Sequence, residues 1–151
     1  GDFVAAVKEY ERLRFHNPNA PLIAENLGLS LWGAKLTDRA QETFQQLKPA
    51  GGLAARRADF WLGQLDFEAA RYQPALDAML RSMPVDGETD FGIPKDRMFS
   101  ALALAYQKLN RPGEAREAWQ KVLVLVPNDA KAQAALKELN RRFPPKKSPK
   151  K

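Results

Sequence analysis

Residues 96–129 read DRMFSALALAYQKLNRPGEAREAWQKVLVLVPND, two apolar runs separated by a short break at residues 110–113. In each run, apolar residues recur three and four positions apart, which is the spacing of one face of a helix. Pro112 and Gly113 end the first helix, and Pro127 ends the second because proline disfavours helical geometry in the residue before it. The stretch therefore predicts a helical hairpin that is too small to bury its own apolar face.

The same spacing recurs along the chain. Three small residues are each followed twelve positions later by an alanine: Gly28 and Ala40, Gly63 and Ala75, Ala103 and Ala115. Together with Ala6, these alanines lie 34, 35 and 40 residues apart, so the period is near 34 and the last gap holds about six inserted residues. We therefore predict about three and a half copies of one helical unit, the first of them lacking its first helix.

The reference copy resembles the tetratricopeptide repeat, whose pattern has bulky and small residues at set places and a closing proline. The residues that carry the resemblance are Phe99, Leu102, Ala103, Tyr106, Ala115, Trp119 and Pro127. The resemblance implies an all-α fold, a right-handed superhelical solenoid of antiparallel helix pairs with a C-terminal capping helix. Such repeats act as protein-interaction modules or scaffolds.

The repeat pattern divides the chain into segments. We expect a tetratricopeptide-like domain over 1–143, and its parts are a half repeat at 1–19, full repeats at 20–49, 54–84 and 96–128, and a capping helix at 129–143. A basic, disordered tail is expected over 144–151. Pro49 and Pro84 follow their alanines by nine residues where Pro127 follows by twelve, so the second helices of the two middle repeats are predicted to end early.

In this family the first helix of each hairpin lines a concave groove that holds a peptide or helix of a partner. Carried onto this chain, the resemblance implies a groove formed by Glu25, Asn26, Leu29, Trp32, Arg57, Phe60, Trp61, Gln64, Phe67, Arg97, Leu104 and Lys108. Four of these are aromatic, and exposed aromatic side chains often anchor interfaces. The alternative is that half of these aromatic residues pack between hairpins.

Chaperone-binding members of the family hold a peptide carboxylate with lysines, asparagines and an arginine. Here Asn26 matches one of those places, Arg97 replaces a lysine, and Glu25 stands where a lysine is needed and would repel a carboxylate. We therefore do not expect this clamp. An apolar or helical partner segment is the better prediction.

The net charge of +6 is concentrated at one end. Six basic residues and no acid occupy the last eleven positions, and the remaining residues balance at 18 basic and 18 acidic. The tail residues Lys146, Lys147, Ser148, Lys150 and Lys151 are therefore an alternative site, for attachment to a nucleic acid or a membrane surface. A solubilising end is the simpler interpretation. A further alternative is self-association through the N-terminal helix edge, giving a homo-oligomer.

Catalysis is not indicated. The chain has no cysteine and one histidine, so thiolate metal sites and most acid–base constellations are excluded, and we predict no enzyme activity, metal or cofactor. Acidic residues at Asp86, Glu88 and Asp90 lack the spacing of a calcium loop and indicate a solvated loop. No apolar run is long enough to span a membrane, so we expect a soluble protein, cytoplasmic or periplasmic.

Overall fold

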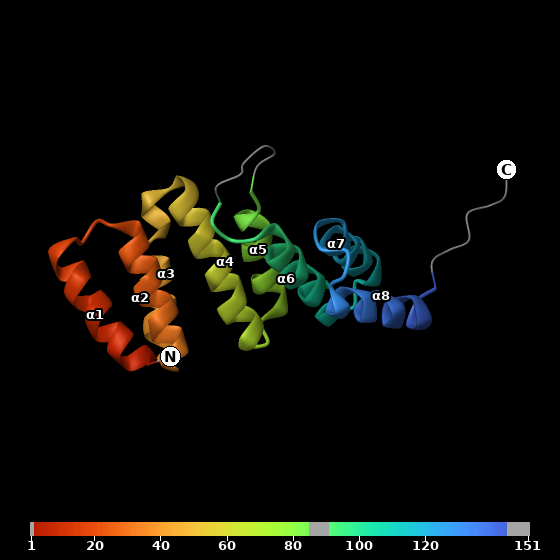
Figure 1. The fold of residues 1–151 in the computed structure, drawn as a ribbon, viewed down its shortest axis with the longest axis horizontal. Helices are drawn as coiled ribbons and strands as arrows, with labels where there is room; N and C mark the ends of the chain where they lie inside the picture. Colours follow the sequence, from red (N-terminus) through yellow and green to blue (C-terminus); the bar gives the residue numbers. More distant parts are fainter. Residues whose placement is uncertain (1, 85–90, 145–151) are drawn as a thin grey trace. The chain divides into compact units, whose positions relative to one another are not determined.

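The computed structural model describes residues 2–84 and 91–144 and divides into two compact units, Gly1–Phe91 (unit 1) and Gly92–Lys151 (unit 2). All regular structure in the described residues is helical (Figure 1). Unit 1 contains α1 (Phe3–His16), α2 (Pro21–Gly33), α3 (Thr37–Gln45), the 3-10 helix η1 (Lys48–Ala50), α4 (Gly52–Glu68) and α5 (Tyr72–Ser82). Unit 2 contains α6 (Lys95–Lys108), α7 (Pro112–Leu125) and α8 (Ala130–Arg142).

In both units, helices that follow one another in the chain pack as hairpins. In unit 1, α2 pairs with α3 and α4 with α5, while α1 packs against α2 and the two hairpins meet through α3 and α4. In unit 2, α6 pairs with α7, and α8 packs against α7. A helix is thus present where the capping helix was predicted, and the carboxylate of Asp129 caps it by accepting a hydrogen bond from the Ala132 amide at 2.7 Å.

The predicted spacing of small residues is confirmed, because each small residue brings two helices together. The alanines of all three second helices, Ala40, Ala75 and Ala115, are fully buried. A Cβ built on Gly28 would lie 2.5 Å from the ring of Phe44, and one built on Gly63 would lie 2.9 Å from the Met79 side chain. The glycines are therefore needed for close approach of the two helices in each hairpin.

Gly28→Ala is expected to lower the free energy of unfolding by about 2 kcal/mol, because Phe44 is fully buried and its ring has little room to move. Urea denaturation measures the loss. Gly113→Ala is the matched control. It lies in the first turn of α7 with open space around it, so alanine there should raise stability by about 0.5 kcal/mol. Equal effects at both positions would contradict the close approach at Gly28.

The three hairpins also turn in the same way. At the end of each first helix stands a residue in the left-handed conformation, with φ of 65°, 59° and 55° at Lys35, Ala70 and Asn110. The amide of the following residue donates to the carbonyl five positions back at 2.9 Å, in the pairs Leu36–Leu31, Arg71–Asp66 and Arg111–Tyr106. This is the Schellman arrangement, which usually uses glycine. The repeat is therefore present in the backbone even where the sequence has no glycine.

The lengths of the second helices agree with the positions of the prolines. Helices α3 and α5 contain 9 and 11 residues, whereas α7 contains 14. The early end predicted for the two middle repeats is thus confirmed. After α3 the chain turns through η1 at Pro49, and this turn leads directly into α4.

A buried carboxylate fixes the position of η1. Asp59 on α4 is 4 % exposed. Its carboxylate forms an ion pair with Lys48 at 2.5 Å and a longer one with Arg81 at 3.4 Å. Because a buried charge is costly unless it is paired, these contacts hold the η1 segment against α4. The predicted acidic loop residues Asp86, Glu88 and Asp90, and the tail residues Lys146, Lys147, Ser148, Lys150 and Lys151, lie outside the described residues.

Candidate partner-binding surface

The predicted groove residues lie on the first helices of the hairpins and divide between the two units. Nine of them lie on α2 and α4 of unit 1: Glu25, Asn26, Leu29, Trp32, Arg57, Phe60, Trp61, Gln64 and Phe67. The other three, Arg97, Leu104 and Lys108, lie on α6 of unit 2. Arg97 and Lys108 are exposed and Leu104 is half-buried, so these three stay predictions for unit 2 alone.

The aromatic residues of the first group are mostly structural. Trp61 is 5 % exposed and Phe60 is fully buried, so the expectation that they are exposed anchors is wrong. The Trp61 ring is stacked near Phe44 and meets Trp32 and Phe60 edge to face, with ring centroids 6.5, 6.4 and 4.9 Å apart respectively. Trp61 therefore joins the α2–α3 hairpin to α4. Trp32 and Phe67 are half-buried.

A polar network joins α2 to α4 beside this aromatic cluster. The Oε1 atom of Glu25 accepts hydrogen bonds from Nε and Nη2 of Arg57, at 3.1 and 2.8 Å, and from Nε1 of Trp61 at 2.7 Å. Glu25 is 4 % exposed. A carboxylate this deeply buried is stable only with such partners, so the network fixes the spacing of the two helices.

A second polar contact lies toward the other ends of the same helices. The indole Nε1 of Trp32 donates to Oε2 of Glu68 at 2.9 Å. Helices α2 and α4 are therefore joined near both ends. The surface between them is held in place before any partner arrives, which reduces the entropy cost of binding.

An apolar cleft opens over the first turns of α2 and α4. Its volume is about 270 Å³, and it is lined by Pro21, Leu22, Glu25, Leu53, Ala54 and Arg57. Leu22 is 60 % exposed and Leu53 is 39 % exposed. The Glu25–Arg57 pair forms the polar part of the lining. Leu53 and Ala54 were not among the predicted groove residues, because Leu53 precedes the predicted repeat and Ala54 is its first residue.

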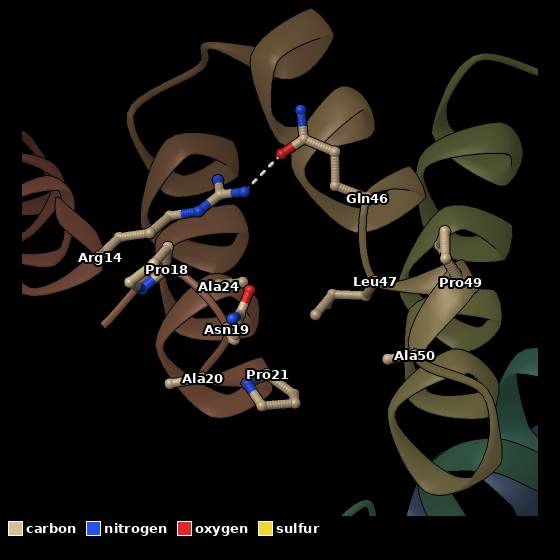
Figure 2. Close-up of a pocket in the computed structure, with 10 residues that line it drawn as sticks. All are labelled: Arg14, Pro18, Asn19, Ala20, Pro21, Ala24, Gln46, Leu47, Pro49 and Ala50. Atoms are coloured by element: carbon tan, nitrogen blue, oxygen red, sulfur yellow. Dashed lines mark hydrogen bonds between the residues drawn. The ribbon is translucent and has the colours of Figure 1, made fainter. Parts of the chain in front are cut away.

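A second, larger cavity lies on the other side of the α2 first turn, with a volume of about 330 Å³ (Figure 2). Its lining combines the last turn of α1, the α1–α2 turn, the start of α2 and the α3–η1 segment: Arg14, Pro18, Asn19, Ala20, Pro21, Ala24, Gln46, Leu47, Pro49 and Ala50. Figure 2 shows the Arg14 side chain reaching across to Gln46, where Nη2 of Arg14 donates to Oε1 of Gln46 at 2.5 Å. Sequence patterns gave no sign of this cavity.

The clear pKa shifts lie away from both cavities. A hydrogen bond from Arg12 lowers the pKa of Glu9, and one from Arg141 lowers the pKa of Glu138. The pKa of Glu114 is lowered by a hydrogen bond from its own backbone amide and then by Arg111. These are exposed pairs within one helix or at its start, and they contribute little to stability. None of the described helices is long and apolar enough to cross a membrane.

Comparison with known proteins agrees with this geometry. The tetratricopeptide repeat family model matches residues 98–129, which include most of α6 and all of α7. Residues 98–129 therefore form a tetratricopeptide repeat. The remaining helices of this repeat protein follow the same pattern in weaker form, which explains why only the clearest copy is matched. No curated protein sequence matches the chain.

Solved structures share the fold of this repeat protein at low sequence identity. A crystal structure of MamA has a TM-score of 0.77 and 21% identity, covering 94% of this chain and 79% of that chain. MamA from residue 41 to its end, from Desulfovibrio magneticus RS-1, has a TM-score of 0.75 and 21% identity, covering 94% and 76%. A MamA MSR-1 structure has a TM-score of 0.71 and 18% identity, covering 93% and 76%. At these identities the likeness concerns the fold.

Proposed function

We propose that this protein is a protein-interaction module that binds an apolar segment of a partner, in helical form, in the cleft between α2 and α4. Repeat folds of this kind present extended surfaces for protein partners. The observation that carries the proposal is the pair of exposed leucines, Leu22 and Leu53, on either side of a cleft whose floor is fixed by Glu25 and Arg57.

In this proposal the residues of the cleft and those of the predicted groove have different roles. Leu22 and Leu53 would touch the partner, because both expose much of their apolar surface beside the cleft. Asn26, Leu29 and Gln64 are half-buried and could extend the contact along α2 and α4. Trp61 and Glu25 would act indirectly, since they fix the distance between the helices. This mode corresponds to a helix seated in a groove, with apolar residues as anchors.

The test is a selection from a phage-displayed library of random peptides, with the 151-residue protein as bait. We expect apolar, helix-forming peptides to be selected and to bind Leu22→Asp with Leu53→Asp at least about tenfold more weakly, since two apolar contacts are lost. The matched control is Leu36→Asp with Leu80→Asp, two leucines 41 % and 45 % exposed in the same unit but outside the cleft. The proposal fails if no peptide is selected, or if both double variants bind the selected peptides equally well.

A further inference from the structure

The cavity beside Arg14 combines one cation with uncharged polar residues and a few apolar ones. Arg14 is the only charged residue among the described residues that line it; Asn19 and Gln46 add side-chain amides, and the apolar lining residues include Pro21, Leu47 and Pro49. Figure 2 shows the Arg14 guanidinium bridging toward Gln46, which carries no charge. A ligand here would meet a positive charge, two side-chain amides, and proline and leucine side chains.

Arg14 lacks a counterion within the described part of the chain. Its side chain is half-buried, and its one hydrogen bond goes to the Gln46 amide oxygen, with no carboxylate in ion-pair contact. Other arginines of this unit, such as Arg39 with Glu11 and Arg71 with Asp66, do pair with acids. Because the Gln46 bond uses only Nη2, the Nε and Nη1 groups of Arg14 remain able to donate to an incoming anion.

The surroundings favour a carboxylate over other anions. A single guanidinium suits one negative charge, and the side chains of Pro21, Leu47 and Pro49 can contact the aliphatic part of an amino acid next to that charge. The first turn of α2 adds the positive end of its helix dipole. No side chain caps this end, because the N-cap residue is Ala20. Gln46 and Asn19 can each donate a further hydrogen bond through their side-chain amides.

The cavity also adjoins the α2–α4 cleft. Pro21 lines both spaces, and Ala24 in the cavity is followed by Glu25 in the cleft. A segment that leaves the cleft over the first turn of α2 therefore arrives at Arg14. Arg14 lies on α1, which corresponds to the second helix of a repeat. The predicted groove residues all lie on first helices, so Arg14 is not one of them.

We propose that the Arg14 cavity binds a carboxylate of the partner segment, with the neighbouring apolar side chain against Pro21, Pro49 and Leu47. The carboxylate is either the C-terminal group of the partner or an Asp or Glu side chain close to its apolar anchor. Arg14 donates to it while keeping its bond to Gln46. This inference rests on the proposed function, because the same segment occupies the cleft.

The direct test is a titration of the ¹⁵N-labelled protein, followed by NMR. N-acetyl-leucine serves as the probe with a terminal carboxylate, and acetyl-leucyl-glutamyl amide as the probe with a side-chain carboxylate. N-acetyl-leucinamide is the uncharged comparison. We expect shifts at Asn19, Leu47 and Ala50, and at least one acid probe binding about tenfold more tightly than the uncharged amide, the effect of one charge-assisted contact. Equal binding of acids and amide would overturn the inference.

Variants separate binding from a structural role of Arg14. Gln46→Glu supplies Arg14 with a carboxylate from the chain itself, so the fold should be kept while affinity for the acid probe falls about tenfold or more. Arg12→Gln, which removes an exposed arginine of the same helix, should leave probe binding unchanged. Unchanged binding by Gln46→Glu would contradict the site.

The outcomes also distinguish this inference from the proposed function. If the acid probes fail while selected peptides still depend on Leu22 and Leu53, the carboxylate site is wrong and the cleft stands. If the acid probes bind at Arg14 while the leucine variants leave peptide binding intact, the cavity is a site of its own and the shared segment is wrong.

Discussion

Trp61→Ala is expected to lower the free energy of unfolding by about 4 kcal/mol, the largest loss we predict for a single substitution. Trp61 is 5 % exposed, and its ring meets Phe44, Trp32 and Phe60. Alanine would leave a cavity where the α2–α3 hairpin meets α4 and would also remove the hydrogen bond to Glu25. Urea denaturation followed by circular dichroism measures the change.

Two further variants separate the causes of this loss. Trp61→Phe keeps an aromatic ring and removes the N–H group, so about 2 kcal/mol should be lost through the missing bond to the Glu25 carboxylate. Trp32→Ala removes a half-buried indole of the same cluster, and it should cost less than half as much as Trp61→Ala. If Trp32→Ala and Trp61→Ala cost the same, Trp61 is not the centre of the junction.

The repeat could be predicted from the sequence because its determinants are local. A small residue opposite a large one recurs in each hairpin, as at Gly28 with Phe44 and Gly63 with Met79, and these pairs lie sixteen residues apart. Close approach of two helices permits few residue types at such positions, so the pattern survives in the sequence. The turn at Ala70 shows the limit, since its left-handed backbone has no glycine to reveal it.

The depth of individual groove residues could not be predicted in the same way. Periodicity assigns a residue to a helix face, but the neighbouring hairpin decides whether that face is covered. Phe60 and Trp61 are consecutive on α4, and consecutive residues of a helix do not face the same side. Both are nevertheless buried, because other helices of unit 1 cover more than one side of α4. The Glu25–Arg57 pair joins residues 32 positions apart, a separation beyond any local pattern.

The charge distribution is also clearer by structural unit. In the sequence, basic and acidic residues are equal in number outside the last eleven positions. The two units differ, however: unit 1 carries ten basic and thirteen acidic residues, and unit 2 carries fourteen basic and five acidic residues. The net charges of −3 and +9 show that part of the basic excess belongs to residues 92–140 and not to the tail alone. The predicted attachment to a polyanion would therefore involve more of unit 2 than its tail.

Glu25→Ala is expected to lower the free energy of unfolding by about 3 kcal/mol, because it leaves two donors without their acceptor. The Arg57 side chain is 21% exposed, and with Glu25 it forms an ion pair at 2.8 Å. The Trp61 N–H group loses its 2.7 Å bond at the same time. The free energy of unfolding is measured for Glu25→Ala, Arg57→Ala and the double variant, so that the cycle gives the energy of the pair itself.

The control is an ion pair of similar geometry at the surface. Glu11 and Arg39 join α1 to α3 at 2.5 Å, with side chains 43% and 53% exposed, so Glu11→Ala should cost less than about 1 kcal/mol. Glu25→Gln should fall between the two, because an amide oxygen still accepts from Trp61 but carries no charge for Arg57. If Glu25→Ala costs no more than Glu11→Ala, the pair does not hold α2 and α4 together. The cleft would then lack a fixed floor, and partner binding would have to form it.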